Sequence, residues 1–256
     1  MGIKRVFVHG NPETAAVWMP LRDALVASGI SSDEIVCLSP PGFGAPLPHD
    51  FEPVAESYRS WLADELDELR SGGDTVDLVG HDWGAGHVYG LLADRPDAVR
   101  SWAADIGGLL HPDYVWHDAA QAWQTPEVGE QVIDMMVTMP LDERVALFEG
   151  LGLPNSMAAE MAPALDADMG RAVLALYRSA PEPELQALAD RLAATTLSPG
   201  LIITAVDDAY VSADLAGPVA QRLGADELRL DGQGHWWMVS DPLGAAAGLL
   251  DFWSRL

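Results

Sequence analysis

The chain has little positive charge and a single cysteine. Lysine and arginine together number 14 against 39 aspartate and glutamate residues, which gives a formal net charge of -25 at pH 7. A negative surplus of this size repels phosphate groups, so it argues against binding to nucleic acid or to an anionic membrane surface. The one cysteine, Cys37, cannot form an internal disulfide. The composition therefore indicates a cytoplasmic protein.

Long apolar runs are also missing. No stretch of about 18 consecutive apolar residues occurs, so the sequence predicts no membrane span. The first strand pattern begins at Ile3, and we expect that this leaves no room for a signal peptide. Hydrophobic residues still make up 49% of the 256 positions, which is enough for the core of one large domain.

What the sequence does contain is an alternation of strand-like and helix-like segments. Short apolar runs predict strands at 3–8, 35–38, 76–79, 102–106, 201–206 and 227–230. Amphipathic or apolar patterns predict helices at 14–27, 53–70, 85–93 and 243–253. This β-α-β alternation predicts an α/β fold, with a mostly parallel sheet flanked by helices on both faces.

The alternation stops between residues 109 and 197. This stretch contains only helical pieces separated by prolines, together with most of the methionines. The sequence therefore predicts an α/β core formed by residues 1–108 and 198–256, with residues 109–197 inserted as a helical cap. An insertion at this point would lie over the ligand crevice at the carboxyl edge of the sheet, where some of its methionines would line an apolar pocket.

The motif Gly-His-Asp-Trp-Gly at residues 80–84 is the most informative part of the sequence. It follows an apolar run and precedes a helical pattern, which is the context of a nucleophile elbow. The flanking glycines allow the sharp turn that such an elbow needs. Its central residue is Asp82, a carboxylate that is ionised at neutral pH and can attack carbon without a partner base. The alternative interpretation is that Asp82 only caps the following helix.

Three further pieces follow predicted strands. The loop His-Gly-Asn-Pro at 9–12 can bring a backbone N–H opposite the elbow, where it would form an oxyanion hole with the amide of Trp83. Asp208 follows one later strand, and His235 follows the next, between a glycine and a tryptophan. The chain order nucleophile, acid, histidine is the one expected for an α/β-hydrolase.

The sequence resembles the α/β-hydrolase fold over nearly its whole length, and within it the aspartate-nucleophile branch of haloalkane dehalogenases and epoxide hydrolases. The motifs that carry the resemblance are those at 9–12, 41–44 (Pro-Gly-Phe-Gly), 80–84, 208 and 234–236. The resemblance implies catalytic roles for Asp82, Asp208 and His235. It also implies that the side chains of Asn11 and Trp83 hold a halide ion, because they match the halide donors of the dehalogenases.

Two other functions stay open. Epoxide hydrolases of this branch use two cap tyrosines to protonate the opening epoxide, and Tyr114 and Tyr177 are the candidates here. Asn11 favours the dehalogenase, because related epoxide hydrolases commonly carry an aromatic or aliphatic residue at that position. The third possibility is a non-catalytic binding protein on the same fold, against which the intact set of three catalytic residues argues.

The sequence predicts neither a cofactor nor a metal. It contains no glycine-rich phosphate-binding loop, and the spacing of its histidines is not that of metal ligands. We interpret His81 as packing behind the elbow, and His87, His111 and His117 as structural or exposed. The expected partners are therefore a small apolar substrate, water and, for the dehalogenase, a halide ion.

Overall fold

The computed structural model describes residues 2–256, in which six strands form one sheet in the order β2-β1-β3-β4-β5-β6. The strands are β1 (Ile3–Val8), β2 (Ile35–Leu38), β3 (Thr75–Gly80), β4 (Ser101–Ala104), β5 (Gly200–Ala205) and β6 (Asp226–Leu230). All neighbouring pairs are parallel. The predicted α/β sheet is therefore confirmed, and every strand ends at the same edge.

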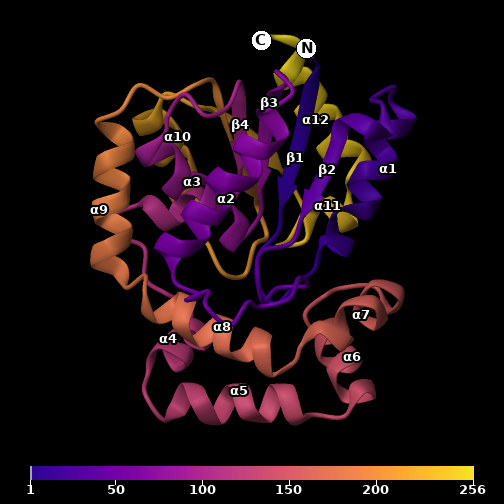
Figure 1. Cartoon of the computed structure of the whole chain (residues 1–256), viewed down its shortest axis with the longest axis vertical. Helices are drawn as coiled ribbons and strands as arrows, with labels where there is room; N and C mark the ends of the chain where they lie inside the picture. Colours follow the sequence, from indigo (N-terminus) through magenta and orange to yellow (C-terminus); the bar gives the residue numbers. More distant parts are fainter. Residues whose placement is uncertain (1) are drawn as a thin grey trace.

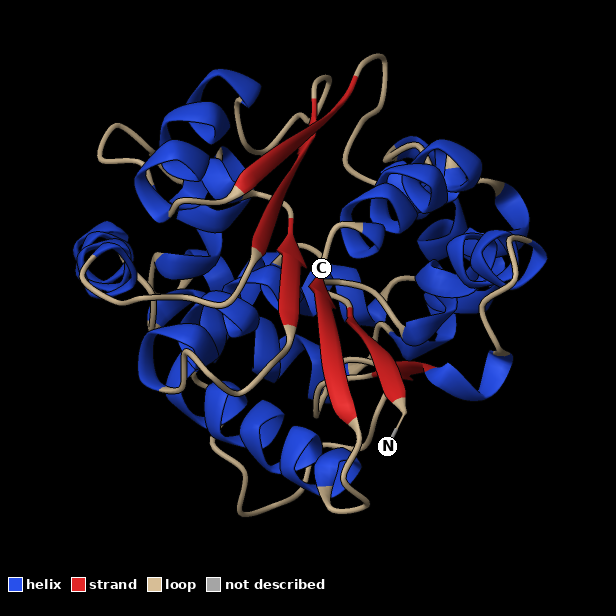
Figure 2. Cartoon of the chain, turned by 90° about the horizontal axis from the view of Figure 1, so that it is seen from above, coloured by secondary structure: helices blue, strands red, loops and turns tan. Residues whose placement is uncertain are grey.

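Helices cover both faces of the sheet, which Figure 2 shows edge-on between two helical layers. One face carries α1 (Met19–Ala27), α11 (Trp237–Ser240) and α12 (Pro242–Ser254), and the other carries α2 (Ala55–Arg70), α3 (Trp83–Asp94), α9 (Glu182–Ala193) and α10 (Ala216–Leu223). Alternate strand residues supply the two cores: Phe7 belongs to one, and Val6 and Val8 to the other.

The predicted helix at 14–27 begins differently from the prediction. Its first turn is a 3-10 helix, Ala15–Trp18, and α1 follows from Met19 with a proline in its first turn. Proline is tolerated there because the N–H groups of the first turn have no acceptor within the helix, so a missing N–H breaks no hydrogen bond. No helix within residues 2–256 has both the length and the apolar composition needed to cross a membrane.

Five further helices lie together beyond the carboxyl edge of the sheet, at the bottom of Figure 1. These cap helices are α4 (Asp118–Gln124), α5 (Val128–Thr138), α6 (Leu141–Gly150), α7 (Asn155–Met161) and α8 (Ala167–Arg178). Prolines separate them, since Pro140 and Pro154 stand directly before α6 and α7. The domain boundaries at 109 and 197 stay a prediction; α9, which falls inside them, packs against α3 of the core.

Candidate active site

Asp82 lies at the sharp turn between β3 and α3. Its φ of 51° and ψ of -126° are unusual for a residue other than glycine, as expected at a nucleophile elbow. The turn also requires close approach of the neighbouring backbone: a Cβ atom at Gly84 would collide with the carbonyl of Val8, and one at Gly10 with the Asp82 side chain. The glycines of both motifs are therefore explained by packing around this carboxylate.

The side chain of Asp82 makes no capping hydrogen bond to α3, so the interpretation as a simple helix cap is wrong. Its Oδ1 instead accepts a hydrogen bond of 2.8 Å from the backbone N–H of Asn11, across the edge of the sheet. This is the predicted position of one oxyanion donor. The amide of Trp83, at the first position of α3, stays a prediction as the second donor.

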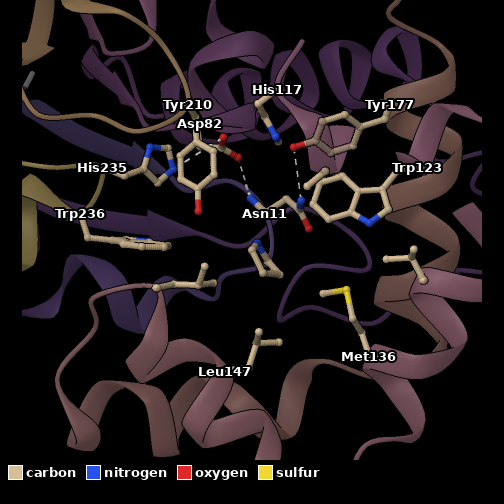
Figure 3. A pocket seen from close by; sticks show the side chains of 14 residues that line it. Asn11, Asp82, His117, Trp123, Met136, Leu147, Tyr177, Tyr210, His235 and Trp236 are labelled. Carbon is tan, nitrogen blue, oxygen red and sulfur yellow. Dashed lines mark hydrogen bonds and ion pairs between the residues drawn. The ribbon is translucent and has the colours of Figure 1, made fainter. Parts of the chain in front are cut away.

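His235 and Asp208 meet Asp82 at the same edge. His235 Nδ1 lies 2.8 Å from Asp208 Oδ2, and its Nε2 lies 3.8 Å from Asp82 Oδ2. The other oxygen of Asp208 accepts hydrogen bonds from the backbone N–H groups of Tyr210 and Val211, which fix the carboxylate. The structure thus brings together the three residues predicted from sequence: Asp208 orients His235, which faces Asp82 (Figure 3).

The electrostatics of these three groups are mutually dependent. Burial alone would lower the pKa of His235, but the hydrogen bond and charge of Asp208 and the charge of Asp82 raise it above its ordinary value. Burial raises the pKa of Asp82, while His235 opposes the increase. The pKa of Asp208 lies below its usual value despite burial, because His235 is bonded to it. The arrangement therefore favours a charged Asp208 beside a protonatable imidazole.

A buried hydrogen-bond network lies behind the three residues. His81 bonds Asp105 through Nδ1 and Glu13 through Nε2, at 3.0 Å in the second case, and all three side chains are almost inaccessible to solvent. Burial opposes the charge of His81, yet the charges of Asp105 and Glu13 raise its pKa well above the ordinary value. The indole N–H groups of Trp236 and Trp237 donate to the same two carboxylates. The network is therefore an imidazolium held between two carboxylates.

This network holds the two loops that carry the site. The second oxygen of Glu13 accepts from the N–H of Gly10 at 3.2 Å, next to Asn11, and Asp105 Oδ1 accepts from the N–H of Asp82 at 2.9 Å. Sequence reasoning interpreted His81 as packing and missed both carboxylates. For Asp105, the sequence did carry a signal, because this carboxylate directly follows β4 in an otherwise apolar segment.

The structure also groups Glu13, His81 and His235, whose potential ligand atoms lie within 4.8 Å of one another. The histidine spacing in the sequence did not suggest such a cluster. Both ring nitrogens of His81 are already bonded to carboxylates, and the raised pKa keeps this ring positively charged. A cation would therefore be repelled, and the cluster is better suited to hydrogen bonding than to metal binding.

A cavity of about 200 Å³ opens between the sheet edge and the cap helices (Figure 3). Its floor is formed by Asp82, Asn11 and His235 of the core. Its far wall is apolar and comes from cap helices α5 and α6, including Met136 and Leu147. Also lining it are Pro12, His117, Ala119, Trp123, Val132, Leu151, Tyr177, Tyr210 and Trp236. The cavity thus combines one polar end with an apolar body.

The two predicted halide donors lie next to Asp82, but their N–H groups make different contacts. The indole N–H of Trp83 is buried and makes only a weak contact with the hydroxyl of Tyr177, outside the geometry of a full hydrogen bond. The side-chain amide of Asn11 donates to the hydroxyl of Tyr177 at 3.4 Å, and the rings of Tyr177 and Trp83 are 5.2 Å apart between centroids. The cap tyrosine therefore lies beside both donors.

The two candidate tyrosines differ in their access to the cavity. Tyr177 lines it, whereas Tyr114 lines a much narrower hollow of about 10 Å³ that Asp82 also borders. Burial raises the pKa of both phenols, so each stays protonated near neutral pH. The structure therefore places Tyr177, but not Tyr114, in the main cavity, a difference that their sequence surroundings did not indicate.

Two polar residues that line the cavity were missed by sequence reasoning. His117, interpreted as structural or exposed, is half-buried and lines the cavity. Tyr210 lies over His235, with the ring centroids 4.7 Å apart. Tyr210 follows Asp208 closely in sequence, which is a usable signal, whereas nothing local marks His117 as a pocket residue.

The comparisons with known proteins agree with this geometry. Residues 6–248 match the alpha/beta hydrolase family. A haloalkane dehalogenase of Bradyrhizobium diazoefficiens is 30% identical, over 92% of this chain and 82% of that protein. Two solved structures share the fold: haloalkane dehalogenase DbeA from Bradyrhizobium elkani (TM-score 0.72, 23% identity, 100% of this chain and 92% of that one) and an E-2-(acetamidomethylene)succinate hydrolase (TM-score 0.71, 19% identity, 99% and 92%). The chain therefore belongs to the alpha/beta hydrolase family and is a hydrolase of the haloalkane dehalogenase-like kind.

Proposed function

We propose that this hydrolase releases halide from small apolar haloalkanes, with Asp82 as the nucleophile. The observation that carries the proposal is the buried indole N–H of Trp83, which lies beside Asp82 and makes no fully formed hydrogen bond within residues 2–256, only a weak contact with the hydroxyl of Tyr177. An unpaired buried donor is costly, and a site for an anion explains its presence. The amide of Asn11 provides a second donor on the same side.

In the first step, a carboxylate oxygen of Asp82 attacks the carbon that carries the halogen. The carbon–halogen bond breaks, the halide leaves with its electron pair, and an alkyl ester of Asp82 remains. A halide in a dry pocket would be strongly destabilised without donors. The N–H groups of Asn11 and Trp83 are neutral donors that would stabilise the charge as it develops.

In the second step, His235 Nε2 removes a proton from water, and the water oxygen attacks the ester carbonyl of Asp82. Negative charge then develops on the carbonyl oxygen, for which the backbone N–H of Asn11 is a ready donor, since it already bonds Oδ1 at 2.8 Å. Asp208 stabilises the imidazolium that forms. Collapse of the intermediate releases the alcohol and restores the carboxylate, so that water and haloalkane become alcohol, halide and a proton.

A second candidate is epoxide opening by the same three residues. It is favoured by the hydroxyl of Tyr177, which lies in the cavity at 3.4 Å from the side-chain amide of Asn11. Its pKa is well above the usual value because of burial, so it would act as a hydrogen-bond donor to the opening epoxide oxygen. Tyr114, the other candidate phenol, lines only the narrow neighbouring hollow.

A panel of short bromo- and chloroalkanes and terminal epoxides separates the two candidates. We expect halide release from the haloalkanes, and none after Asp82→Ala. Asp208→Asn should slow turnover strongly, whereas Asp207→Asn, which alters an exposed neighbour, is its matched control. Diol formation from the epoxides without halide release from any haloalkane would favour the epoxide hydrolase, and the absence of both products would favour the binding protein.

A further inference from the structure

His117 lies in a position that the catalytic scheme does not use. It stands directly before cap helix α4, and its ring points into the space between Asp82 and Tyr177 (Figure 3). Its ring centroid is 5.0 Å from that of Tyr210 and 6.2 Å from that of Trp123. An imidazole is thus held by aromatic rings at the polar end of an otherwise apolar cavity.

The helix start determines which nitrogen of this ring carries the proton. His117 Nδ1 accepts a hydrogen bond of 3.3 Å from the backbone N–H of Ala120, in the manner of a helix N-cap. Burial lowers the pKa of His117 to about 4, so the ring is neutral at pH 7. A neutral imidazole that accepts through Nδ1 must carry its proton on Nε2. The nitrogen left for a bound molecule is therefore a donor.

We propose that His117 is a specificity-determining residue, and that its Nε2–H binds an oxygen acceptor of the substrate close to the carbon that Asp82 attacks. This rests on the proposed function, because it assumes attack of Asp82 on carbon. The preferred substrates are then haloalkanes that carry an ether or hydroxyl oxygen near the halogen.

The physical reason is the cost of an unpaired donor. A purely hydrocarbon chain that displaces water from the cavity would leave the Nε2–H of His117 without a partner. A site that contains such a donor discriminates strongly against analogues that lack the acceptor. The wall from α5 and α6, including Met136 and Leu147, makes only apolar contacts and would not distinguish the two chains by hydrogen bonding. The other polar lining groups, of Asn11, Tyr177 and Tyr210, stay in place when His117 alone is replaced.

The test compares 1-bromobutane with 1-bromo-2-methoxyethane, in which an ether oxygen replaces one methylene group. We expect His117→Asn to lower the ratio of kcat/KM for the ether to that for the alkane about tenfold, which corresponds to one hydrogen bond of ~1.4 kcal/mol. Asparagine preserves the helix cap but is too short to supply the donor. The ratio cancels any general loss of activity, and Asp118→Asn, at the exposed next residue, should leave it unchanged.

An unchanged ratio in a folded His117→Asn variant would overturn the proposal. If that variant fails to fold, His117→Ser keeps a capping side chain and provides the same comparison, with thermal melting as the check. If the wild type releases halide from neither compound, the proposed function fails instead. The donor is then tested in Asp82→Asn, with and without His117→Asn, by calorimetric affinity for the two compounds. Equal affinity ratios in those two proteins would refute the role of His117.

Discussion

The two sides of the cavity are built differently. On the core side, the charged groups are interlocked: His81 bonds Glu13 and Asp105, and His235 bonds Asp208. On the cap side, the side chains are mostly apolar, and several large ones face outward; Met135 is 60% exposed and Leu141 48% exposed. Buried polar atoms without a hydrogen-bond partner within residues 2–256 occur on both sides, among them Asn11 Oδ1 on the core side and the indole nitrogen of Trp123 on the cap side.

We interpret this difference as a division of roles: the core side holds the reacting groups, and the cap side selects the substrate. In the proposed reaction, displacement and ester hydrolysis need a few atoms held in one geometry, which a bonded network anchored on strand ends supplies. A substrate chain needs only an apolar wall that can adapt, and short helices with methionine and leucine side chains supply it. We therefore expect core substitutions to abolish or retune the reaction, and cap substitutions to change which molecule is used.

The largest effect is expected for His235→Gln. The first step does not use His235, so the alkyl ester should form and persist, because no base remains to activate water. Intact-mass analysis after incubation with a bromoalkane should show one adduct, while steady-state halide release is lost. Turnover at the wild-type rate, or consumption of substrate without an adduct, would remove His235 from this role.

Asn11→Ala should come next. The side-chain donor to the leaving halide is lost, whereas the backbone N–H that bonds Asp82 remains. By analogy with loss of one oxyanion donor, we expect a cost of about 3 kcal/mol, on the order of a hundredfold in the rate of ester formation. Rapid-mixing halide measurements check this, with Asn155→Ala, at an exposed cap residue, as the control. A normal rate would contradict a halide site at Asn11.

His81→Gln should move a pH profile. The positive charge of His81 lowers the pKa of His235, and its removal leaves the negative charges of Glu13 and Asp105 nearby. The pKa of His235 should therefore rise, and because His235 must be neutral to take a proton from water, the acid limb of kcat should move to higher pH by about one unit.

The control for that experiment is Trp237→Phe, which removes an indole donor from the same network without changing its charge. Its acid limb should stay at the wild-type pH, whatever the rate. If His81→Gln lowers kcat equally at all pH values, the network acts on geometry alone, and the electrostatic part of this argument is wrong.

The smallest effect is expected on the cap side. Leu147→Ala enlarges the cavity at its apolar wall, so the ratio of kcat/KM for 1-bromopentane to that for 1-bromobutane should rise about fourfold, from ~0.8 kcal/mol for the one extra methylene buried. Leu243→Ala, at a residue 70% exposed on α12, should leave the ratio unchanged. A large loss of activity toward both substrates would show that the cap also positions the reacting atoms.

Much of this site could be predicted from the sequence, because apolar runs show where the strands end. Asp82, Asp208 and His235 each follow a predicted strand, and parallel strands end at one edge, so their side chains had to meet there. The predicted halide donors Asn11 and Trp83 were named through a resemblance, and both lie beside Asp82. The choice between dehalogenase and epoxide hydrolase depended on fewer residues, namely Asn11 in a core loop and Tyr114 and Tyr177 in the predicted cap.

The sequence by itself determined the sheet, the elbow and the chain order of the proposed catalytic residues, because local periodicity and glycine spacing specify these local features. Only the tertiary structure decided the rest. Glu13 meets His81 across 68 positions and Trp236 across 223, and no local pattern encodes such contacts. The same holds for His117, whose place in the cavity depends on how a cap helix packs over the sheet edge. Burial and charge in that packed state, not residue type, assign these side chains their protonation and hence their roles.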